Sequence, residues 1–256
     1  MGSGLKQVNG NPSAPPYTGD AYTWDAYVRF KAGLESTSRY WLEETFQQLP
    51  SINASIAIST NLDFEVLGTN ASADDVTYDA VRAGIKIETD GATNDSVIIL
   101  PHLDTSQTAW TGTKWGTENQ TTWECILTTG ASVAAAALWA GLKLTNVDTV
   151  ATDNDQVYFR YDTSPATWTV VASIGGTDVE FDTGVTVSAD TAYYFRIEVQ
   201  ADRTAKCYIN DALVYTTGAL TNDVDLIPYV GVRTITGSAA KSLILHRERI
   251  SRILFE

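Results

Sequence analysis

The sequence predicts an all-β protein, an antiparallel two-sheet sandwich or barrel, from three observations. Short runs of β-prone residues follow one another from about residue 52 to the C-terminus. Turn-forming stretches such as "DGATND", "TDND" and "GGTD" separate these runs, and several runs alternate apolar and polar residues with a period of two. Short strands at this spacing, with no helical segments between them, are typical of sandwiches and barrels.

The N-terminal part of the chain is expected to differ from the rest. Residues 1–20 are rich in Gly, Pro, Ser and Asn and predict a flexible, extended arm. In residues 21–60, "AYTWDAYVRFK" alternates with a period of two and predicts a strand. The following run lacks this alternation, and a single short helix is expected over about 38–48, followed by Pro50. We therefore expect 21–60 to be a separate assembly segment.

Residues 61–256 are expected to form the sandwich itself. "ASVAAAALWAGL" has helical propensity, but its neighbours are strands, so we interpret it as the entry to a strand. "TAKCYIND" and "ALVYTT" predict a hairpin, because Asn210 and Asp211 tolerate the positive φ of a tight primed turn. "TAYYFRIEVQAD" is the expected third strand. The two cysteines, Cys125 and Cys207, lie in apparent strands and are expected to be buried free thiols.

The charge balance argues against some classes of partner. The chain has 17 Lys and Arg against 31 Asp and Glu, a formal net charge of −14, and no basic run. Because a nucleic-acid-binding surface needs basic residues to meet phosphates, we expect no DNA or RNA partner. No apolar run approaches the roughly 20 residues that span a bilayer, so no membrane partner is expected either.

Two sets of motifs resemble known families. "YYFRIEVQADRTAKCYINDALVYTT", followed by "LIPYVGV", resembles the last strands of a concanavalin A-like or laminin G-like jelly roll, although Asn-Asp replaces the usual Asn-Gly at the turn. "SVIILPHLDTSQTAWTGTKWGTENQTTWECILTTG", "WAGLKLTN" and "TDNDQVYFRYD" resemble virion structural proteins of tailed bacteriophages, over about residues 60–256. The resemblance implies a two-sheet antiparallel jelly-roll sandwich.

The second resemblance also implies a function: a non-enzymatic virion protein, made in the host cytoplasm, that decorates a capsid and binds capsid subunits. Contacts would come from the arm and the helix, with Trp41 and Phe46 as interface residues. A homo-oligomer is expected, and a trimer would suit a capsid surface, by analogy with other viral jelly rolls.

The last 16 residues, "KSLILHRERISRILFE", are basic in an otherwise acidic chain. Arg247, Arg249 and Arg252 are expected to dock an acidic neighbouring subunit. The alternative is that they are ordinary edge-strand charges that block aggregation.

Glycan binding by a phage adhesin or receptor-binding module is the alternative function. Trp123 and Trp139 lie in or beside apolar strands and are expected to fill the core. Trp110 and Trp115 lie in the Thr- and Gly-rich loop "AWTGTKWGT" and could present exposed faces on which sugars stack. The other interpretation is that both are loop anchors folded onto the sandwich.

A polysaccharide-degrading enzyme is a third and weaker alternative. Asp178, Glu180 and Asp182 share one strand face, but they do not match the Glu-x-Asp-x-x-Glu pattern of retaining hydrolases with this fold. His102 and its neighbours in "PHLDTSQ" do not have the spacing of a hydrolytic triad. We therefore expect no catalytic residues.

Cofactors are not expected, with Ca²⁺ as the one alternative. Two loops carry several oxygen ligands, although neither has the EF-hand spacing. Their candidate residues are Asp148, Asp153, Asn154, Asp155, Asp90, Asn94 and Asp95. Asp and Asn are also the ordinary residues of tight turns, so no metal site is predicted.

Overall fold

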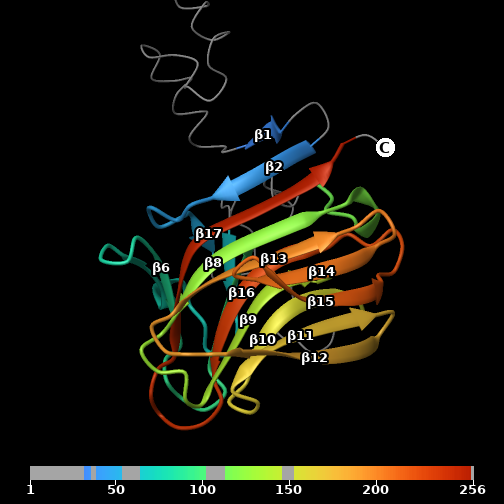
Figure 1. Cartoon of the computed structure of the whole chain (residues 1–256). Helices are drawn as coiled ribbons and strands as arrows, with labels where there is room; N and C mark the ends of the chain where they lie inside the picture. Colours follow the sequence, from blue (N-terminus) through green and yellow to red (C-terminus); the bar gives the residue numbers. More distant parts are fainter. Residues whose placement is uncertain (1–31, 36–38, 54–63, 102–112, 146–152, 255–256) are drawn as a thin grey trace, which may run out of the picture.

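Two β-sheets pack face to face in the computed structural model (Figure 1). The structure describes residues 32–35, 39–53, 64–101, 113–145 and 153–254. Besides strands, these ranges contain two short 3-10 helices, Ala73–Asp75 and Thr117–Asn119. The predicted two-sheet antiparallel sandwich is confirmed. Within the same ranges, no helix has the length and apolar character needed to cross a bilayer.

Sheet A has nine strands among the described residues, in the order β1-β2-β17-β8-β13-β14-β15, with β6 also paired to β17 and β5 paired to β6. Its strands are β1 Ala32–Glu35, β2 Arg39–Glu44, β5 Val76–Asp79, β6 Gly84–Glu88, β8 Thr122–Thr129, β13 Ala192–Val199, β14 Thr204–Ile209, β15 Ala212–Ala219 and β17 Ser242–Ile253.

Sheet B has eight strands in the described part of the chain, in the order β12-β11-β10-β9-β16-β7-β4-β3. Its strands are β3 Ile52–Asn53, β4 Phe64–Leu67, β7 Ser96–Pro101, β9 Ala136–Lys143, β10 Gln156–Tyr161, β11 Thr167–Ile174, β12 Thr177–Thr186 and β16 Ile227–Thr234. The strand predicted near Trp139 is β9. Neighbouring strands pair antiparallel except β3 and β4, which pair parallel.

The main core lies between the sheets, and β8 shows how the sequence builds it. Trp123, Cys125 and Leu127 are buried, while the residues between them are half-buried on the opposite face. This period of two is that of a strand with one face in the core. Both cysteines are free and buried, as predicted, and burial raises the pKa of both thiols.

A buried carboxyl group, that of Glu248 on β17, also faces the core, and the residue is 2% exposed. Trp123 donates from its Nε1 to Oε1 of Glu248 at 2.9 Å. Glu248 pairs in register with Cys125, so its side chain lies on the inner face of sheet A. The polar residues on either side of Glu248 in the sequence lie on the outer face.

The predicted hairpin at residues 210 and 211 is confirmed. Asn210 and Asp211 have φ of 51° and 64°, and they join β14 to β15 between the paired residues Ile209 and Ala212. Positive φ at both central residues is the mark of a type I′ turn, whose twist suits antiparallel strands. The third strand, β13, pairs with β14 as expected.

Replacing Asp211 with glycine should stabilise the protein by about 0.5–1 kcal/mol, because glycine adopts positive φ without the Cβ clash. The ion pair that is lost is weak, since Asp211 is exposed and lies 3.7 Å from Arg196. Urea unfolding of the two proteins measures the difference. A lower midpoint for Asp211→Gly would contradict the assignment of the turn.

The predicted helix over 38–48 is wrong, because residues 39–44 form strand β2. β2 pairs antiparallel with β1 on one side and with β17 on the other. The hydrogen bonds of β2 with these two strands override its local helical propensity, although β17 is distant from it in the sequence. Within the strand, Leu42 points into the core whereas Trp41 lies on the other face and is half-buried.

The expected boundary at residue 61 also needs correction. Leu42 and Phe46 belong to the main core, where the Phe46 ring lies 5.6 Å from that of Phe64. Residues 39–53 are therefore part of the sandwich rather than a separate assembly segment. The arm, residues 1–20, and the strand predicted in "AYTWDAYVRFK" lie outside the described residues.

Candidate functional site

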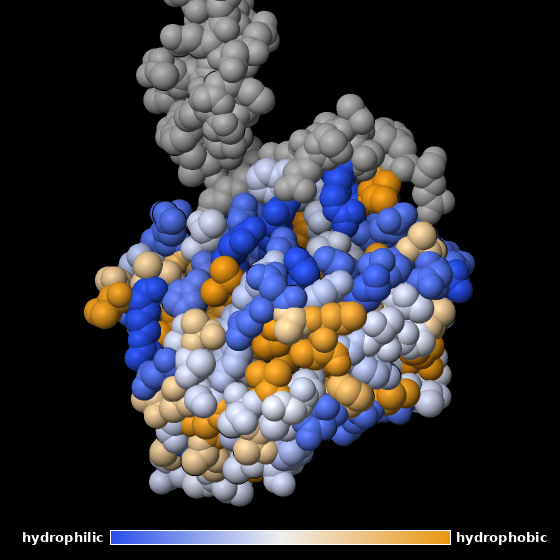
Figure 2. Space-filling model, in the orientation of Figure 1, coloured by the Kyte–Doolittle hydropathy of each residue, from blue (hydrophilic) through white to orange (hydrophobic). Residues whose placement is uncertain are grey.

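The outer face of sheet A carries a row of charged side chains on paired strands. Because the register aligns β2, β17, β8 and β13, one row across these strands reads Glu43, Arg249, Glu124 and Arg196. Adjacent strands lie about 4.8 Å apart, so the row places charges of alternating sign at near-contact spacing. Figure 2 shows hydrophilic side chains gathered over β2, β17 and β8 on this side of the molecule.

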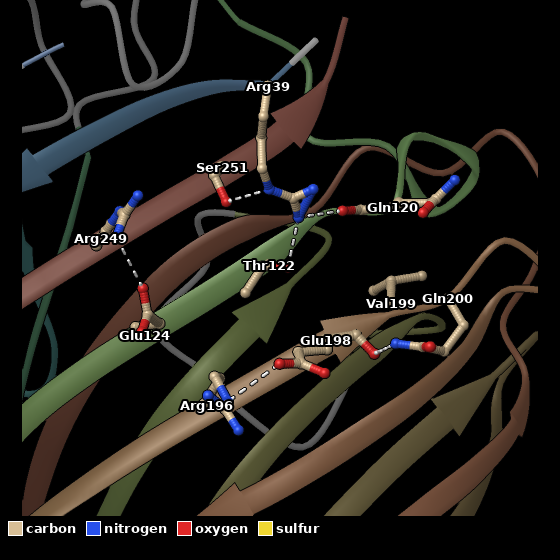
Figure 3. A pocket seen from close by; sticks show the side chains of 10 residues that line it. All are labelled: Arg39, Gln120, Thr122, Glu124, Arg196, Glu198, Val199, Gln200, Arg249 and Ser251. Atoms are coloured by element: carbon tan, nitrogen blue, oxygen red, sulfur yellow. Dashed lines mark hydrogen bonds and ion pairs between the residues drawn. The ribbon is translucent and has the colours of Figure 1, made fainter. Parts of the chain in front are cut away.

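A hollow of about 370 Å³ opens on this face between β2, β17, β8 and β13 (Figure 3). We call it the sheet A groove. Its size is within the range of roughly 300–1,000 Å³ that is usual for small-ligand sites. The side chains that line it are almost all polar: Arg39, Gln120, Thr122, Glu124, Arg196, Glu198, Val199, Gln200, Arg249 and Ser251.

Glu124 is a lining residue of the groove and is held from two sides. Arg249 Nη1 lies 3.6 Å from its Oε2, and the Tyr194 hydroxyl donates to its Oε1. Burial, and then the hydrogen bond to Glu124, raise the pKa of Tyr194 to about 12. The Arg249 guanidinium in turn lies 5.3 Å from the Trp41 ring centroid. These contacts fix the orientation of the Glu124 carboxylate.

Arg196 forms the second fixed group of the groove. Its Nε lies 3.2 Å from Oε1 of Glu198, which is two residues along the same face of β13. Its guanidinium lies 4.2 Å from the ring centroid of Tyr208 on β14. Stacking on an aromatic ring and pairing with a carboxylate hold a guanidinium in one plane.

Arg39 extends into the groove from the start of β2. It donates from Nε to Ser251 Oγ at 3.1 Å, and from Nη2 to Thr122 Oγ1 at 2.6 Å and to the Gln120 carbonyl at 2.8 Å. These bonds join β2, β17 and β8 across the groove wall (Figure 3). The groove therefore presents guanidinium, carboxylate, hydroxyl and amide groups in fixed positions.

The two tryptophans predicted to bind glycans have different outcomes. Trp115 is 1% exposed and stacks with Tyr40 at a centroid distance of 6.1 Å, so it is a core residue and offers no face to a sugar. The alternative interpretation, a loop anchor packed on the sandwich, is correct for Trp115. Trp110 lies outside the described residues. Trp123 and Trp139 are buried as predicted.

The two subunit-interface residues predicted in this region, Trp41 and Phe46, differ in their burial. Phe46 is fully buried, so it is unavailable to a neighbouring subunit and that prediction is corrected. Trp41 is half-buried on the outer face of sheet A beneath the Arg249 guanidinium. Its role in subunit contact stays a prediction.

The basic residues of β17 have partners within the chain. Arg247 pairs with Glu43, Arg249 with Glu124, and Arg252 donates to the Lys114 carbonyl. Their interpretation as edge-strand charges is wrong, because β17 pairs with β8 on one side and with β2 and β6 on the other. Docking of another subunit by these arginines stays a prediction.

The three acidic residues predicted to share a strand face, Asp178, Glu180 and Asp182, lie on β12, at the edge of sheet B. The groove is on the other sheet, sheet A. Arg160 donates to both oxygens of Glu180, at 2.8 and 2.7 Å, and thereby lowers the pKa of that carboxyl. The Gly184 backbone N–H likewise lowers the pKa of Asp182. Neither group has the raised pKa that a general acid needs near neutral pH. His102 and its neighbours lie outside the described residues.

Several carboxylates of the acidic loops accept hydrogen bonds within the chain. Asp95 accepts from the Ala92 backbone N–H at 2.6 Å, and Asp153 accepts from that of Leu144 at 2.9 Å. These are turn-stabilising bonds of the ordinary kind. Asp148 lies outside the described residues. Among the residues that the structure places, no cluster of three or more His, Cys, Asp or Glu could hold a metal.

Of the residues that line the groove, the sequence analysis identified only Arg249 as a candidate. A signal for them exists in the alternation of β8 and β13, since Glu124 lies between buried Trp123 and Cys125, and Arg196 lies between buried Phe195 and Ile197. Such a pattern shows that a residue faces away from the core. It does not show which strands are neighbours, and the groove depends on that order.

Comparison with known proteins identifies a family and structures that share the fold. The family model described as "SO2946-like, C-terminal domain" matches residues 81–243. A Shewanella oneidensis protein of unknown function, SO2946, superposes with a TM-score of 0.59 at 12% identity, covering 91% of this chain and 95% of that chain. No curated protein matches the sequence.

Two further solved structures share the fold and have named activities. A Bacillus licheniformis β-glucanase superposes with a TM-score of 0.53 at 9% identity, covering 84% of this chain and 99% of that chain. The carbohydrate recognition domain of Emp46p superposes with a TM-score of 0.50 at 7% identity, covering 78% of this chain and 95% of that chain. At these identities the likeness shows the fold alone, and it confirms the predicted concanavalin A-like jelly roll. Neither is described as a virion protein.

Proposed function

The chain belongs to the SO2946-like C-terminal domain family, and within this fold we propose that it binds a carbohydrate in the sheet A groove. The observation that carries the proposal is the lining of the groove. Its planar guanidinium and carboxylate groups are held in place by contacts on neighbouring strands, as at Glu124 and Arg196. Sugars present many hydroxyl groups, and planar side chains of both kinds can form paired hydrogen bonds with adjacent hydroxyls.

The fold supports the proposal as an analogy. Structures of the same fold include a glucanase and a carbohydrate recognition domain. A shared fold does not establish a shared function, so the proposal depends on the groove residues and the likeness only adds to it.

We further propose that binding occurs without cleavage. A glycosidase needs one carboxylic acid that carries a proton and a second carboxylate as base or nucleophile. In the groove, Glu124 and Glu198 each lie beside a guanidinium, those of Arg249 and Arg196. Glu124 also accepts from the Tyr194 hydroxyl, so both carboxylates already have partners within the chain, and neither is positioned as a separate acid or nucleophile.

Binding is tested by titrating a panel of neutral and acidic polysaccharides against the protein and two groove variants, Glu124→Ala and Arg196→Ala. Each variant is expected to weaken binding at least tenfold, or about 1.4 kcal/mol, because a fixed polar group is lost. The matched control is Glu180→Gln, which alters a carboxylate that is ion-paired with Arg160 on the other sheet. Equal affinity in all four proteins would remove the groove from the proposal.

Cleavage is tested on any polysaccharide that binds, by measuring new reducing ends or unsaturated products over time. No product above that of a protein-free control is expected. Product formation that is lost in Glu124→Gln or Glu198→Gln would show that the groove is catalytic.

The virion role stays a separate proposal, supported by the sequence resemblance over about residues 60–256. It includes capsid partners, a homo-oligomer and a location on the particle. A glycan-binding groove would fit a receptor-binding protein of a phage. Deletion of residues 2–20 should abolish incorporation into particles while the sandwich still folds, and normal incorporation would count against the role of the arm.

A further inference from the structure

The charged groups of the sheet A groove have partners within the chain. Three arginines and two glutamates are among its lining residues. A third carboxylate, that of Asp211, lies 3.7 Å from Arg196 Nη1 and brings the local balance of formal charge to zero. Glu198 also lies beside Arg196, and Glu124 lies beside Arg249. A ligand with a net charge would therefore have to compete with these internal partners.

Arg39 likewise directs its donors to the wall of the groove. Its Nε donates to Ser251 Oγ at 3.1 Å, and its Nη2 donates to Thr122 Oγ1 at 2.6 Å and to the Gln120 carbonyl at 2.8 Å. Ser251 on β17 and Thr122 on β8 are paired in register, so their hydroxyls are neighbours on the groove surface (Figure 3). The guanidinium therefore holds two adjacent hydroxyl groups in place.

The direction of these bonds determines what the two hydroxyls can do. A hydroxyl oxygen that accepts from a guanidinium turns its own hydrogen away from that donor. The structure gives neither the Thr122 nor the Ser251 hydroxyl an acceptor among the residues that it describes. Ser251 is only 5% exposed, and a buried donor without an acceptor costs free energy. Both hydroxyls are thus oriented to donate to an acceptor in the groove.

The glutamates supply acceptors on the same surface. Glu198 on β13 pairs in register with Thr122, and Glu124 lies two residues along β8 from it. Glu124 Oε1 accepts from the Tyr194 hydroxyl, but a carboxylate can accept about four hydrogen bonds. A sugar hydroxyl both donates and accepts, so it can meet both kinds of group. A ligand carboxylate can only accept, and a ligand ammonium can only donate.

We infer that the ligand of the groove is a neutral polysaccharide. The Thr122 and Ser251 hydroxyls donate to its oxygen atoms, and Glu124 and Glu198 accept from its hydroxyl groups. The inference rests on the proposed carbohydrate function and specifies its ligand class. The formal net charge of −14 on the chain adds repulsion against acidic polymers.

The test compares neutral oligosaccharides with charged forms of the same backbone. Neutral gluco-, galacto- and manno-oligosaccharides are titrated against the full chain. Beside them are titrated the same oligosaccharides oxidised at C6 to the uronate, or with an amino group in place of the C2 hydroxyl. At least one neutral form is expected to bind, and to bind about tenfold or more tightly than both of its charged forms. Its affinity should change less than about twofold between low and high salt, because the ligand carries no charge to be screened.

Two variants test the hydroxyl donors. Thr122→Val and Ser251→Ala are each expected to weaken binding of that neutral form at least about fivefold, because each removes one donor. The matched control is Thr77→Val on β5, an exposed residue that does not line the groove, and it should leave the affinity unchanged. The comparison of ligands uses the unaltered chain, so it is decisive even where a variant is unstable.

The outcomes separate this inference from the proposed function. If a uronate or amino form binds as tightly as its neutral parent, the ligand class is wrong and carbohydrate binding stands. If Thr122→Val and Ser251→Ala both bind a neutral form as tightly as the wild type, the two hydroxyls are not its donors and the inference is overturned. If no form of any backbone binds, the proposed function fails with it.

Discussion

Glu248→Gln is expected to remove most of the stability loss that the protein undergoes between about pH 5 and about pH 8. Burial raises the pKa of the Glu248 carboxyl to about 7, and the hydrogen bond from Trp123 offsets only part of this effect. The other titratable group in register with it is the Cys125 thiol, which is buried and whose pKa is raised. The thiol therefore ionises above this pH range, and we assign the change in stability within the range to Glu248.

The direction follows from the two states of the chain. In the unfolded chain the carboxyl has its ordinary pKa of 4.5, and in the folded protein it has a pKa of about 7. The folded state holds the proton more tightly, so folding is favoured at low pH and this advantage is lost as the pH rises from about 4.5 to about 7. Each pKa unit corresponds to about 1.4 kcal/mol, so the loss from this group is about 3 kcal/mol.

Glutamine keeps an acceptor for the Trp123 indole N–H and cannot ionise. Urea unfolding of the wild type and Glu248→Gln at about pH 5, 6, 7 and 8 measures the free energy of unfolding of each, and the variant should show the flatter profile. Glu180→Gln is the control, because the pKa of Glu180 is lowered and its titration lies below this range. Parallel profiles for the wild type and Glu248→Gln would show that the buried carboxyl does not titrate there.

The same residue illustrates how far the sequence can be interpreted. In "KSLILHRERISRILF" the charged residues Arg247, Glu248 and Arg249 are consecutive. The apolar residues on either side predict a strand, but they do not show which of the three charged residues faces the core. Pairing shifts between Leu245 and Arg247, where β17 contains a bulge relative to β8. The bulge decides that Glu248 lies on the inner face, and no local feature of the sequence announces it.

The two-sheet architecture and the hairpin could be predicted because turns and alternation are local properties. β2 could not, because its strand structure depends on β17, which pairs Arg252 with Tyr40 although they are 212 residues apart in the sequence. The groove shares this dependence. Arg39, Glu124 and Arg196 come from three strands, and only the sheet order brings them to one surface.

Trp115→Ala is expected to destabilise the protein by about 3–5 kcal/mol, the range for truncating a large aromatic residue in a core. Trp115 was a candidate sugar platform from its sequence context, and an exposed platform would lose almost no stability on truncation. In the structure it is 1% exposed and stacks with Tyr40 of β2. Its backbone carbonyl accepts from the Leu226 N–H at 3.1 Å, so the residue also ties the segment before β8 to the one before β16.

The control for this variant is Trp41→Ala, which removes a half-buried indole from the outer face of sheet A and should cost clearly less. Urea unfolding gives the free energies, and glycan titration under conditions where each variant is folded gives the affinities. Trp115 is not a lining residue of the groove. Its truncation should therefore change the free energy of unfolding by more kcal/mol than it changes the free energy of glycan binding. Loss of affinity with unchanged stability would instead restore Trp115 as a binding residue, since a tryptophan that is absent from the core can act only at the surface.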